Sequence, residues 1–277
     1  MNHKDIHPNP KISVITVCFN AQTTIAHTIH SVLNQSYKNL ELLICDGCSS
    51  DKTIATVQQF TDPRIKLVSE PDSGLYDAIN KGIKRATGEI IHILNADDQY
   101  ASTDVLENIA ALFMNNSIPI DIVYSGIRYI NDQGDNLDEW RPNTFFHGSY
   151  VKGFHTPHPG FFTTCQTYDR LGLYNTDFKV AADFDLMLRF MEDEKIHSHK
   201  LDAITVLMRA DGRSSTLSGI LNGFFEVRRS LEDNNQDIGL IPFVYRRYAP
   251  KVRGKFFRLF QAVFGRFLEL GNLKLFH

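Results

Sequence analysis

The chain has 277 residues, of which 43% are hydrophobic and 22% are charged. This composition is ordinary for a folded soluble protein, and the length suits one large domain with an appendage better than two equal domains. No run approaches the ~18–20 consecutive apolar residues of a membrane span, so we expect no segment to cross a bilayer.

The formal net charge of −3 is unevenly distributed along the chain. Residues 243–277 contain eight Lys or Arg and one acid, a net charge of +7, whereas the preceding 242 residues contain 21 basic and 31 acidic side chains, a net charge of −10. An acidic body with a basic tail predicts that the tail meets something anionic.

The four cysteines are too few to form a disulfide framework in a chain of this length. Their sparseness, together with the lack of an apolar N-terminal signal, predicts a reducing cytoplasm. Cys45 and Cys48 match a C-x-x-C spacing, but no second pair completes a zinc site. Two small residues at the end of a strand are the simpler interpretation.

Residues 1–10 are polar, contain two prolines and are expected to form a flexible leader. Short apolar runs then alternate with segments of helical periodicity. We expect Leu75, Ile79 and Ile83 to face inward on one of these helices. The alternation predicts a parallel, right-handed α/β sheet. The expected strands are 11–19, 40–45, 65–69 and 89–94, and the expected helices are 25–33, 53–60 and 75–86.

The second half of the chain is less regular. Segment 178–191 predicts a helix whose first turn carries Asp183 and Asp185, a position where the helix macrodipole also favours acids. A long aromatic loop at 140–150 is typical of a lid or binding segment. The other expected elements are a helix at 103–114, strands at 118–124, 127–130 and 201–208, and a polar loop at 209–218.

The stretch Glu89–Tyr100 carries the strongest local indication of chemistry. Its apolar run is typical of a strand covered on both faces, and it ends in Asn95, Ala96, Asp97 and Asp98. Ligands bind outside the carboxyl ends of strands in open α/β sheets, and a hard cation such as Mg²⁺ binds one or two carboxylates together with substrate phosphates. The turn therefore indicates a metal–diphosphate site, and an Asx-rich turn is the alternative.

Six segments, taken together and in this order, resemble the family 2 glycosyltransferases, most closely their bacterial polysaccharide and O-antigen branch, which includes the colanic acid enzymes. No one of these short motifs would be specific alone. The segments are KISVITVCFN (11–20), DGCSSDKT (46–53), SEPDSGLYDAINKGIKRATG (69–88), LNADD (94–98), HPGFF (158–162) and AADFDLMLRF (181–190).

This resemblance implies a GT-A fold over residues 11–220, meaning a Rossmann-like, mostly parallel sheet flanked by helices, followed by a basic helical extension over 221–277. It also implies a nucleotide-sugar donor, a divalent Mg²⁺ or Mn²⁺, and inversion at the anomeric carbon. The implied donor-binding residues begin at the nucleobase and continue to the phosphates and sugar. They are Phe19, Asn20, Asp46, Glu70, Asp72, Gly74, Tyr76, Asp77, Asn80, Lys81, Asn95 and Ala96.

The segment Asn95-Ala96-Asp97 stands where the family carries its D-x-D metal motif. Because Asn95 replaces the first acid, Asp97 would bring the formal charge to the metal, helped by Asp98. Asp183 stands where the family places its catalytic base, which would deprotonate the acceptor hydroxyl; a helix N-cap is the alternative. His158 is a candidate contact to acceptor or diphosphate, and a structural histidine is the alternative.

Residues 251–270 repeat apolar side chains at near-helical spacing, with Lys and Arg mostly off the apolar stripe. This pattern predicts that region 246–270 lies on an anionic membrane surface, and a helix packed on the domain is the alternative. We therefore expect a cytoplasmic protein, peripheral on the inner face of the bacterial inner membrane, where a lipid-linked acceptor would be met.

The expected function is inverting, metal-dependent transfer of a sugar from a nucleotide-diphosphate donor to a hydroxyl of a lipid-linked saccharide, in synthesis of a surface polysaccharide such as the O-antigen of lipopolysaccharide. One alternative is a catalytically idle sugar-nucleotide-binding or assembly subunit. Another is a sugar nucleotidyltransferase, but the turn after Phe19 lacks the Gly and Lys that such enzymes usually carry there. No basic and aromatic sheet pattern indicates nucleic acid binding.

Overall fold

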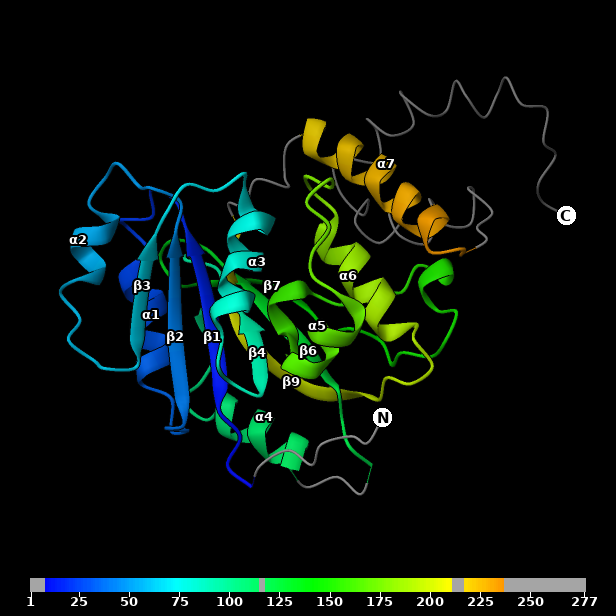
Figure 1. Cartoon of the computed structure of the whole chain (residues 1–277), viewed down its shortest axis with the longest axis horizontal. Helices are drawn as coiled ribbons and strands as arrows, with labels where there is room; N and C mark the ends of the chain where they lie inside the picture. Colours follow the sequence, from blue (N-terminus) through cyan, green and yellow to red (C-terminus); the bar gives the residue numbers. More distant parts are fainter. Residues whose placement is uncertain (1–7, 115–117, 211–216, 237–277) are drawn as a thin grey trace, which may run out of the picture.

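The computed structural model describes residues 8–114, 118–210 and 217–236. Within these ranges one central sheet has the strand order β3-β2-β1-β4-β8-β6-β9-β5, and β7 pairs with β6. Helices pack on both faces of this sheet (Figure 1). None of the described helices combines the length and the apolar character needed to cross a membrane.

The first half of the chain builds the parallel part of the sheet, in which β3, β2, β1 and β4 run side by side in the same direction. Every residue of β1, β2 and β4 is buried, as expected for strands covered on both faces. The elements are β1 (Ile12–Cys18), α1 (Ile25–Leu33), β2 (Leu40–Asp46), α2 (Thr53–Val57), β3 (Ile65–Ser69), α3 (Leu75–Arg85) and β4 (Ile90–Ile93).

The second half extends the sheet with mixed directions. β8 runs antiparallel between β4 and β6, whereas β9 runs parallel to β6. The elements are β5 (Gln99–Tyr100), α4 (Val105–Met114), β6 (Ile122–Ile130), β7 (Asn136–Trp140), the short 3₁₀ helices η1 (Tyr150–Lys152) and η2 (His158–Gly160), β8 (Phe161–Thr164), α5 (Cys165–Leu171), α6 (Ala182–Met191), β9 (Ser198–Arg209) and α7 (Leu217–Asp233).

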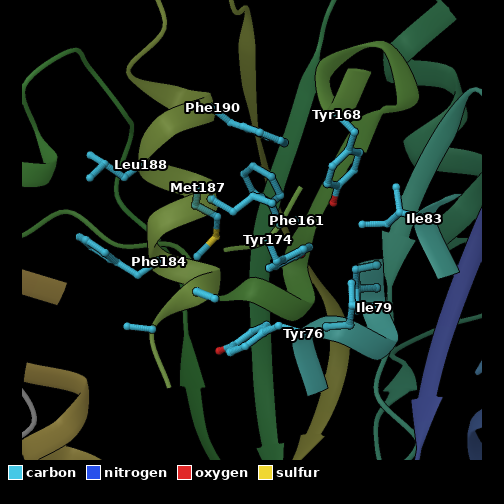
Figure 2. Packing of buried hydrophobic residues seen from close by; sticks show 14 of the residues in the cluster. Tyr76, Ile79, Ile83, Phe161, Tyr168, Tyr174, Phe184, Met187, Leu188 and Phe190 are labelled. Carbon is cyan, nitrogen blue, oxygen red and sulfur yellow. The ribbon is translucent and has the colours of Figure 1, made fainter. Parts of the chain in front are cut away.

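Two hydrophobic cores lie on opposite faces of the sheet because successive strand residues point to opposite sides. Val14 of β1 packs in the core that contains buried residues of α1 and α4. Ile15 packs in the other core, with residues of α3, α5, α6 and α7. Figure 2 shows part of this second core, in which Tyr76 and Ile79 of α3 meet aromatic side chains such as Tyr174.

Four expectations differ from the structure. Leu75 does not face inward: it is 51% exposed at the first position of α3, where the core no longer covers the helix. Segments 118–124 and 127–130 are not separate strands, because Ile122–Ile130 forms one strand whose register with β9 shifts around Gly126. The helix expected over 53–60 ends at Val57. α5 was not predicted; it begins where the Thr164 side chain accepts a hydrogen bond from Thr167 N.

His92 is the one polar side chain within β4, and it is fully buried. Its Nε2 lies 2.8 Å from the Pro159 carbonyl oxygen, so Nε2 carries the proton and Nδ1 accepts from the Tyr100 hydroxyl, also at 2.8 Å. Its ring stacks on Phe162. Burial lowers the pKa of His92 to about 3, so the ring is neutral and ties β4 to β5 and η2.

Glu41 lies near the amino end of β2 and is 2% exposed. Lys66 Nζ lies 2.6 Å and Lys11 Nζ 3.1 Å from its Oε2. Ser13 Oγ and Thr87 N donate to its Oε1 at 2.6 and 2.7 Å. This carboxylate therefore joins β1, β2 and β3 to the segment that leads from α3 into β4.

Candidate active site

The carboxyl ends of the four parallel strands place four predicted segments along one edge of the sheet. In the strand register Cys18 lies beside Asp46, and Asp46 lies beside Ser69. The turn that begins at Asn95 follows β4, which pairs with β1. The site expected beyond the ends of these strands is therefore built from residues distant in sequence.

Asp46 is 2% exposed, and its carboxylate holds the loop that follows β2. Its Oδ2 accepts hydrogen bonds from Ser49 N at 3.0 Å and from Ser69 Oγ at 2.7 Å. Ser49 Oγ also donates to Oδ1 of Asp46. These bonds to its oxygens fix the loop beside the position expected for the nucleobase.

Phe19 and Asn20 follow β1 and lie next to the loop after β2, to which Asn20 is hydrogen-bonded. Phe19 is 57% exposed, and an aromatic ring at the edge of a site can stack on a planar base. Asn20 adopts a left-handed conformation with φ of 54°, and its Oδ1 accepts from Ser50 N at 2.9 Å. A Cβ on Gly47 would lie 3.6 Å from the Phe19 ring and 2.4 Å from an Asp72 oxygen, so Gly47 lies between these two side chains.

A small pocket unites four of the predicted donor-binding residues: it is lined by Asp46, Glu70, Asp72 and Lys81, together with Cys45, Val68 and Ala78. The Arg85 guanidinium is paired with Glu70 at 3.0 Å. The structure thus brings together residues that the sequence separates by up to 35 positions.

The loop before α3 and the first turns of this helix lie next to the pocket, and α3 contributes Ala78 and Lys81 to its lining. Gly74 has a φ of 125°, a conformation that favours glycine, and its N–H donates to Asp72 Oδ1 at 2.8 Å. Asp77 Oδ2 accepts from Ser73 N at 2.9 Å and pairs with Lys81 Nζ, also at 2.9 Å. These hydrogen bonds from Ser73 N and Lys81 lower the pKa of Asp77. Lys81 also donates to the Pro71 carbonyl at 2.8 Å, so both charges are held at the pocket.

Tyr76 and Asn80, which also belong to α3, point toward the second half of the domain. Asn80 exchanges two hydrogen bonds with the backbone of Tyr174, at 2.9 and 3.0 Å. The Tyr76 hydroxyl donates to the Val180 carbonyl at 2.9 Å, and its ring stacks on Tyr174 (Figure 2). Both side chains therefore connect the donor half of the site to the half that carries Asp183.

The acidic turn after β4 holds two adjacent carboxylates of different exposure. Ala96 and Asp98 are buried, and Asn95 Nδ2 donates to Asp98 Oδ2 at 3.1 Å. Asp97 is half-buried. Burial raises the pKa of Asp97, opposed by the positive charge of Arg209, and burial together with Asp97 raises the pKa of Asp98 well above its usual range.

These features fit a divalent cation whose coordination is completed by oxygens of a bound diphosphate. Among the described residues there is no group of three or more His, Cys, Asp or Glu arranged to hold a metal. A hard cation at Asp97 would thus take further oxygens from a diphosphate, as Mg²⁺ commonly does. A cation there would also relieve the repulsion that disfavours ionisation of the two neighbouring carboxylates.

Asp183 lies half-buried in the first turn of α6, beside His158 and Tyr174. His158 Nε2 lies 2.7 Å from the Tyr174 hydroxyl. Burial lowers the pKa of His158, opposed by the negative charge of Asp183. Burial raises the pKa of Tyr174 well above its usual range, and Asp183 is among the groups that add to this effect. An accessible carboxylate beside a neutral histidine is suited to accept a proton.

Sequence reasoning missed two residues of this region. Tyr174 comes from an irregular segment without a motif, although it contacts both His158 and Tyr76. Arg209 ends β9, is paired with Asp132, and brings a positive charge near Asp97. The sequence signal that could have identified Arg209 is its position as a basic residue directly after the predicted strand 201–208.

Comparison with known proteins identifies what this arrangement is similar to. The family model described as Glycosyl transferase family 2 matches residues 13–174. An uncharacterized glycosyltransferase of Mycobacterium tuberculosis is 31% identical over 183 residues, which cover 65% of this chain and 68% of that protein. The UDP-Glc:alpha-D-GlcNAc-diphosphoundecaprenol beta-1,3-glucosyltransferase WfgD of Escherichia coli is 38% identical over 122 residues, covering 44% of this chain and 47% of that protein.

Solved structures show the same fold at low sequence identity. S. aureus TarS 1–349 in complex with UDP-GlcNAc has a TM-score of 0.68 at 17% identity, over 89% of this chain and 75% of that one. The mannosyltransferase PcManGT of Pyrobaculum calidifontis, in complex with GDP-Man and Mn²⁺, has a TM-score of 0.61 at 20% identity, over 91% and 73%. These similarities confirm the expected fold class, a curled, mostly parallel sheet flanked by helices.

Proposed function

We propose that this chain, which belongs to glycosyl transferase family 2 and is a glycosyltransferase, acts in bacterial polysaccharide synthesis. In the proposed reaction it transfers one sugar from a nucleoside-diphosphate donor to a hydroxyl of a lipid-linked saccharide. The observation that carries the proposal is the gathering of Asp46, Glu70, Asp72 and Lys81 around one pocket at the edge of the sheet where the Asp97 turn also lies. The named activities of relatives such as WfgD support the nucleotide-sugar donor and the lipid-diphosphate acceptor.

Glycosyl transfer requires the donor to be held while its diphosphate leaves. In the proposed complex Phe19 stacks on the base and Asp46 orders the loop around it. Mg²⁺ or Mn²⁺, when bound, would supply positive charge to the leaving diphosphate, with Asp97 as its protein ligand and Asp98 supporting it. Lys81 brings positive charge to the donor pocket, and Arg209 brings positive charge near Asp97.

The acceptor hydroxyl needs a base, and Asp183 is assigned that role. As the acceptor oxygen bonds to the anomeric carbon, the bond from that carbon to the phosphate oxygen breaks and its electron pair leaves with the diphosphate. The hydroxyl proton passes to the Asp183 carboxylate. One displacement at the anomeric carbon inverts its configuration, and the diphosphate leaves without needing a proton.

The acceptor side and the cellular location are also proposals. The loop between Trp140 and Tyr150 exposes Phe146, which is 54% exposed, and an apolar side chain there suits a sugar or lipid contact. The expected membrane-binding region 246–270 lies outside the described residues. We infer that the protein works in the cytoplasm, peripheral to the inner membrane, because the proposed lipid-linked acceptor resides there.

Titration calorimetry with a panel of nucleoside diphosphates tests the donor half of this proposal. Binding of one nucleotide should require Mn²⁺ or Mg²⁺, disappear in EDTA, and weaken at least tenfold in Asp97→Ala. Asp104→Ala, which changes an exposed acid at the start of α4, is the matched control and should bind normally. Equal binding with and without metal, or in Asp97→Ala, would overturn the metal assignment.

A further inference from the structure

The carboxylate of Glu226, on α7, accepts hydrogen bonds from three consecutive backbone N–H groups. Lys179 N donates to its Oε1 at 2.9 Å, and Val180 N and Ala181 N both donate to its Oε2 at 2.8 Å. Bonds of this kind to an ionised carboxylate are about twice as strong as those between neutral groups. The three residues immediately precede α6, whose first turn carries Asp183.

The same helix also holds α6 just beyond Asp183. Ser230, one turn after Glu226, donates from its hydroxyl to Asp185 Oδ1 at 2.8 Å. Val227 and Leu231 on this face of α7 are buried in the hydrophobic core that contains α6, and the two helices pack together (Figure 1). α7 thus fixes the chain on both sides of Asp183.

The segment anchored by Glu226 is held from the opposite side as well. The Val180 carbonyl accepts from the Tyr76 hydroxyl at 2.9 Å, while the Val180 N–H donates to Glu226. Tyr76 belongs to α3, which contributes Ala78 and Lys81 to the lining of the donor pocket. One peptide segment is therefore clamped between the donor half and α7, and the position of Asp183 depends on both anchors.

We propose that Glu226 is a positioning residue for sugar transfer, because it fixes residues 179–181 and thereby directs the Asp183 carboxylate toward the acceptor hydroxyl. The inference rests on the proposed function, which assigns Asp183 as the base. Glu226 does not line the donor pocket, so its loss should slow the chemical step without weakening donor binding. Misplacement of a catalytic group by about 1 Å can reduce a rate about 100-fold.

The test compares Glu226→Ala with two variants of the same helix. Glu232→Ala removes an exposed glutamate that pairs with Arg228, and Ser230→Ala removes a buried hydrogen bond to Asp185. In Glu226→Ala we expect kcat to fall about 10- to 100-fold, with the donor KM and nucleotide Kd changed less than twofold. Glu226→Asp, which keeps the carboxylate, should recover part of kcat. Glu232→Ala should behave as wild type.

Two activity-independent measurements accompany the kinetics. Hydrogen exchange at the amides of residues 179–181 should accelerate in Glu226→Ala and stay unchanged in Glu232→Ala. Thermal unfolding, followed by fluorescence of Trp140, the single tryptophan, separates positioning from stability. Ser230→Ala should lower the unfolding temperature while keeping most of kcat. If Glu226→Ala does not fold, Glu226→Gln, which retains one acceptor oxygen, carries the same comparison.

The outcomes distinguish this inference from the function on which it rests. A wild-type kcat in Glu226→Ala would overturn the positioning role and leave the transferase intact. Unchanged exchange at residues 179–181 would also overturn it. If wild-type protein transfers no sugar from any nucleotide sugar tested, the proposed function fails, and the positioning role fails with it.

Discussion

Replacing Glu41 with Gln tests the electrostatic account of the fold away from the site. Burial disfavours ionisation of Glu41, but hydrogen bonds from Lys66, Ser13, Thr87 and Lys11 outweigh burial and lower its pKa from 4.5 to about 2. Gln keeps the shape of the side chain and removes the charge that both lysines face. The change therefore isolates the value of the ionised carboxylate.

The magnitude follows from the pKa of Glu41. At about 1.4 kcal/mol for each pH unit, a pKa near 2 instead of 4.5 corresponds to roughly 3 kcal/mol of folding free energy at neutral pH. Lys11 and Lys66 are 34% and 48% exposed, so solvent screening reduces this figure, and we expect a loss of about 2 kcal/mol. Because the folded-state pKa is the lower one, the stabilisation is complete above pH 4.5 and disappears as the pH falls toward 2.

Urea unfolding followed by Trp140 fluorescence measures this difference. The free energy of unfolding of wild type minus Glu41→Gln should be about 2 kcal/mol at pH 7 and should shrink steadily below pH 4.5. Glu232→Gln, on the exposed face of α7, is the control and should change stability by less than about 0.5 kcal/mol. A difference for Glu41→Gln that stays constant from pH 7 to pH 3 would refute the reasoning.

Two further predictions concern Asp183 and His92. Asp183→Asn should lower kcat by about 10²- to 10⁴-fold while leaving nucleotide binding intact, because the amide cannot take the hydroxyl proton. Steady-state kinetics and calorimetry check this, and a wild-type kcat would show that another group is the base. His92 has a folded-state pKa of about 3, below its usual 6.5, so wild type should lose up to about 1.4 kcal/mol of stability per pH unit as the pH falls below 6.5. His92→Gln should be less stable at pH 7 but should lack this slope between pH 6.5 and 5, and an unchanged slope would show that another group causes it.

The parallel half of the fold could be predicted because local sequence and tertiary environment agree there. β1, β2 and β4 are mostly apolar and buried throughout, so their pattern is typical of strands covered on both faces. α5 could not be predicted in this way. It has only seven residues, CQTYDRL, of which Thr167 and Tyr168 are buried, too few to give a helical period. Leu75 shows the opposite error, since its spacing matches Ile79 and Ile83 but the buried face at this spacing begins one turn later, at Ile79.

Burial separates two acids that the sequence left equivalent. Asp183 and Asp185 both lie in the first turn of α6, where the helix dipole favours acids. Asp185 is 3% exposed; it pairs with Arg189 at 2.9 Å and accepts from Ser230. Asp183 remains half-buried and accessible. The structure therefore supports Asp185 as a structural acid and leaves Asp183 as the candidate base, a distinction that depends on partners 45 residues away.

The same dependence on distant partners explains why Glu226 was not found from the sequence. The residues next to Glu226 in the sequence indicate only an ordinary helical glutamate. Its three partners are backbone N–H groups, which a residue pattern cannot reveal. α7 itself begins at Leu217 and continues past residue 220, where we expected the extension to start. Because Val227 and Leu231 are buried against α6, residues of the expected extension belong to the core of the domain.

The replacement of an acid by Asn95 also has a physical consequence in this fold. Asp98 is buried and Asp97 is half-buried; burial raises the pKa of both carboxyl groups, and the charge of Asp97 raises the pKa of Asp98 further. A third carboxylate at position 95 would add to that repulsion whenever no cation is present. Asn95 instead donates from Nδ2 to Asp98, which lowers the cost of ionising that buried acid. The turn thus leaves Asp97 as the more exposed of the two carboxylates, while Asn95 supports the buried Asp98, as the proposed cation site requires.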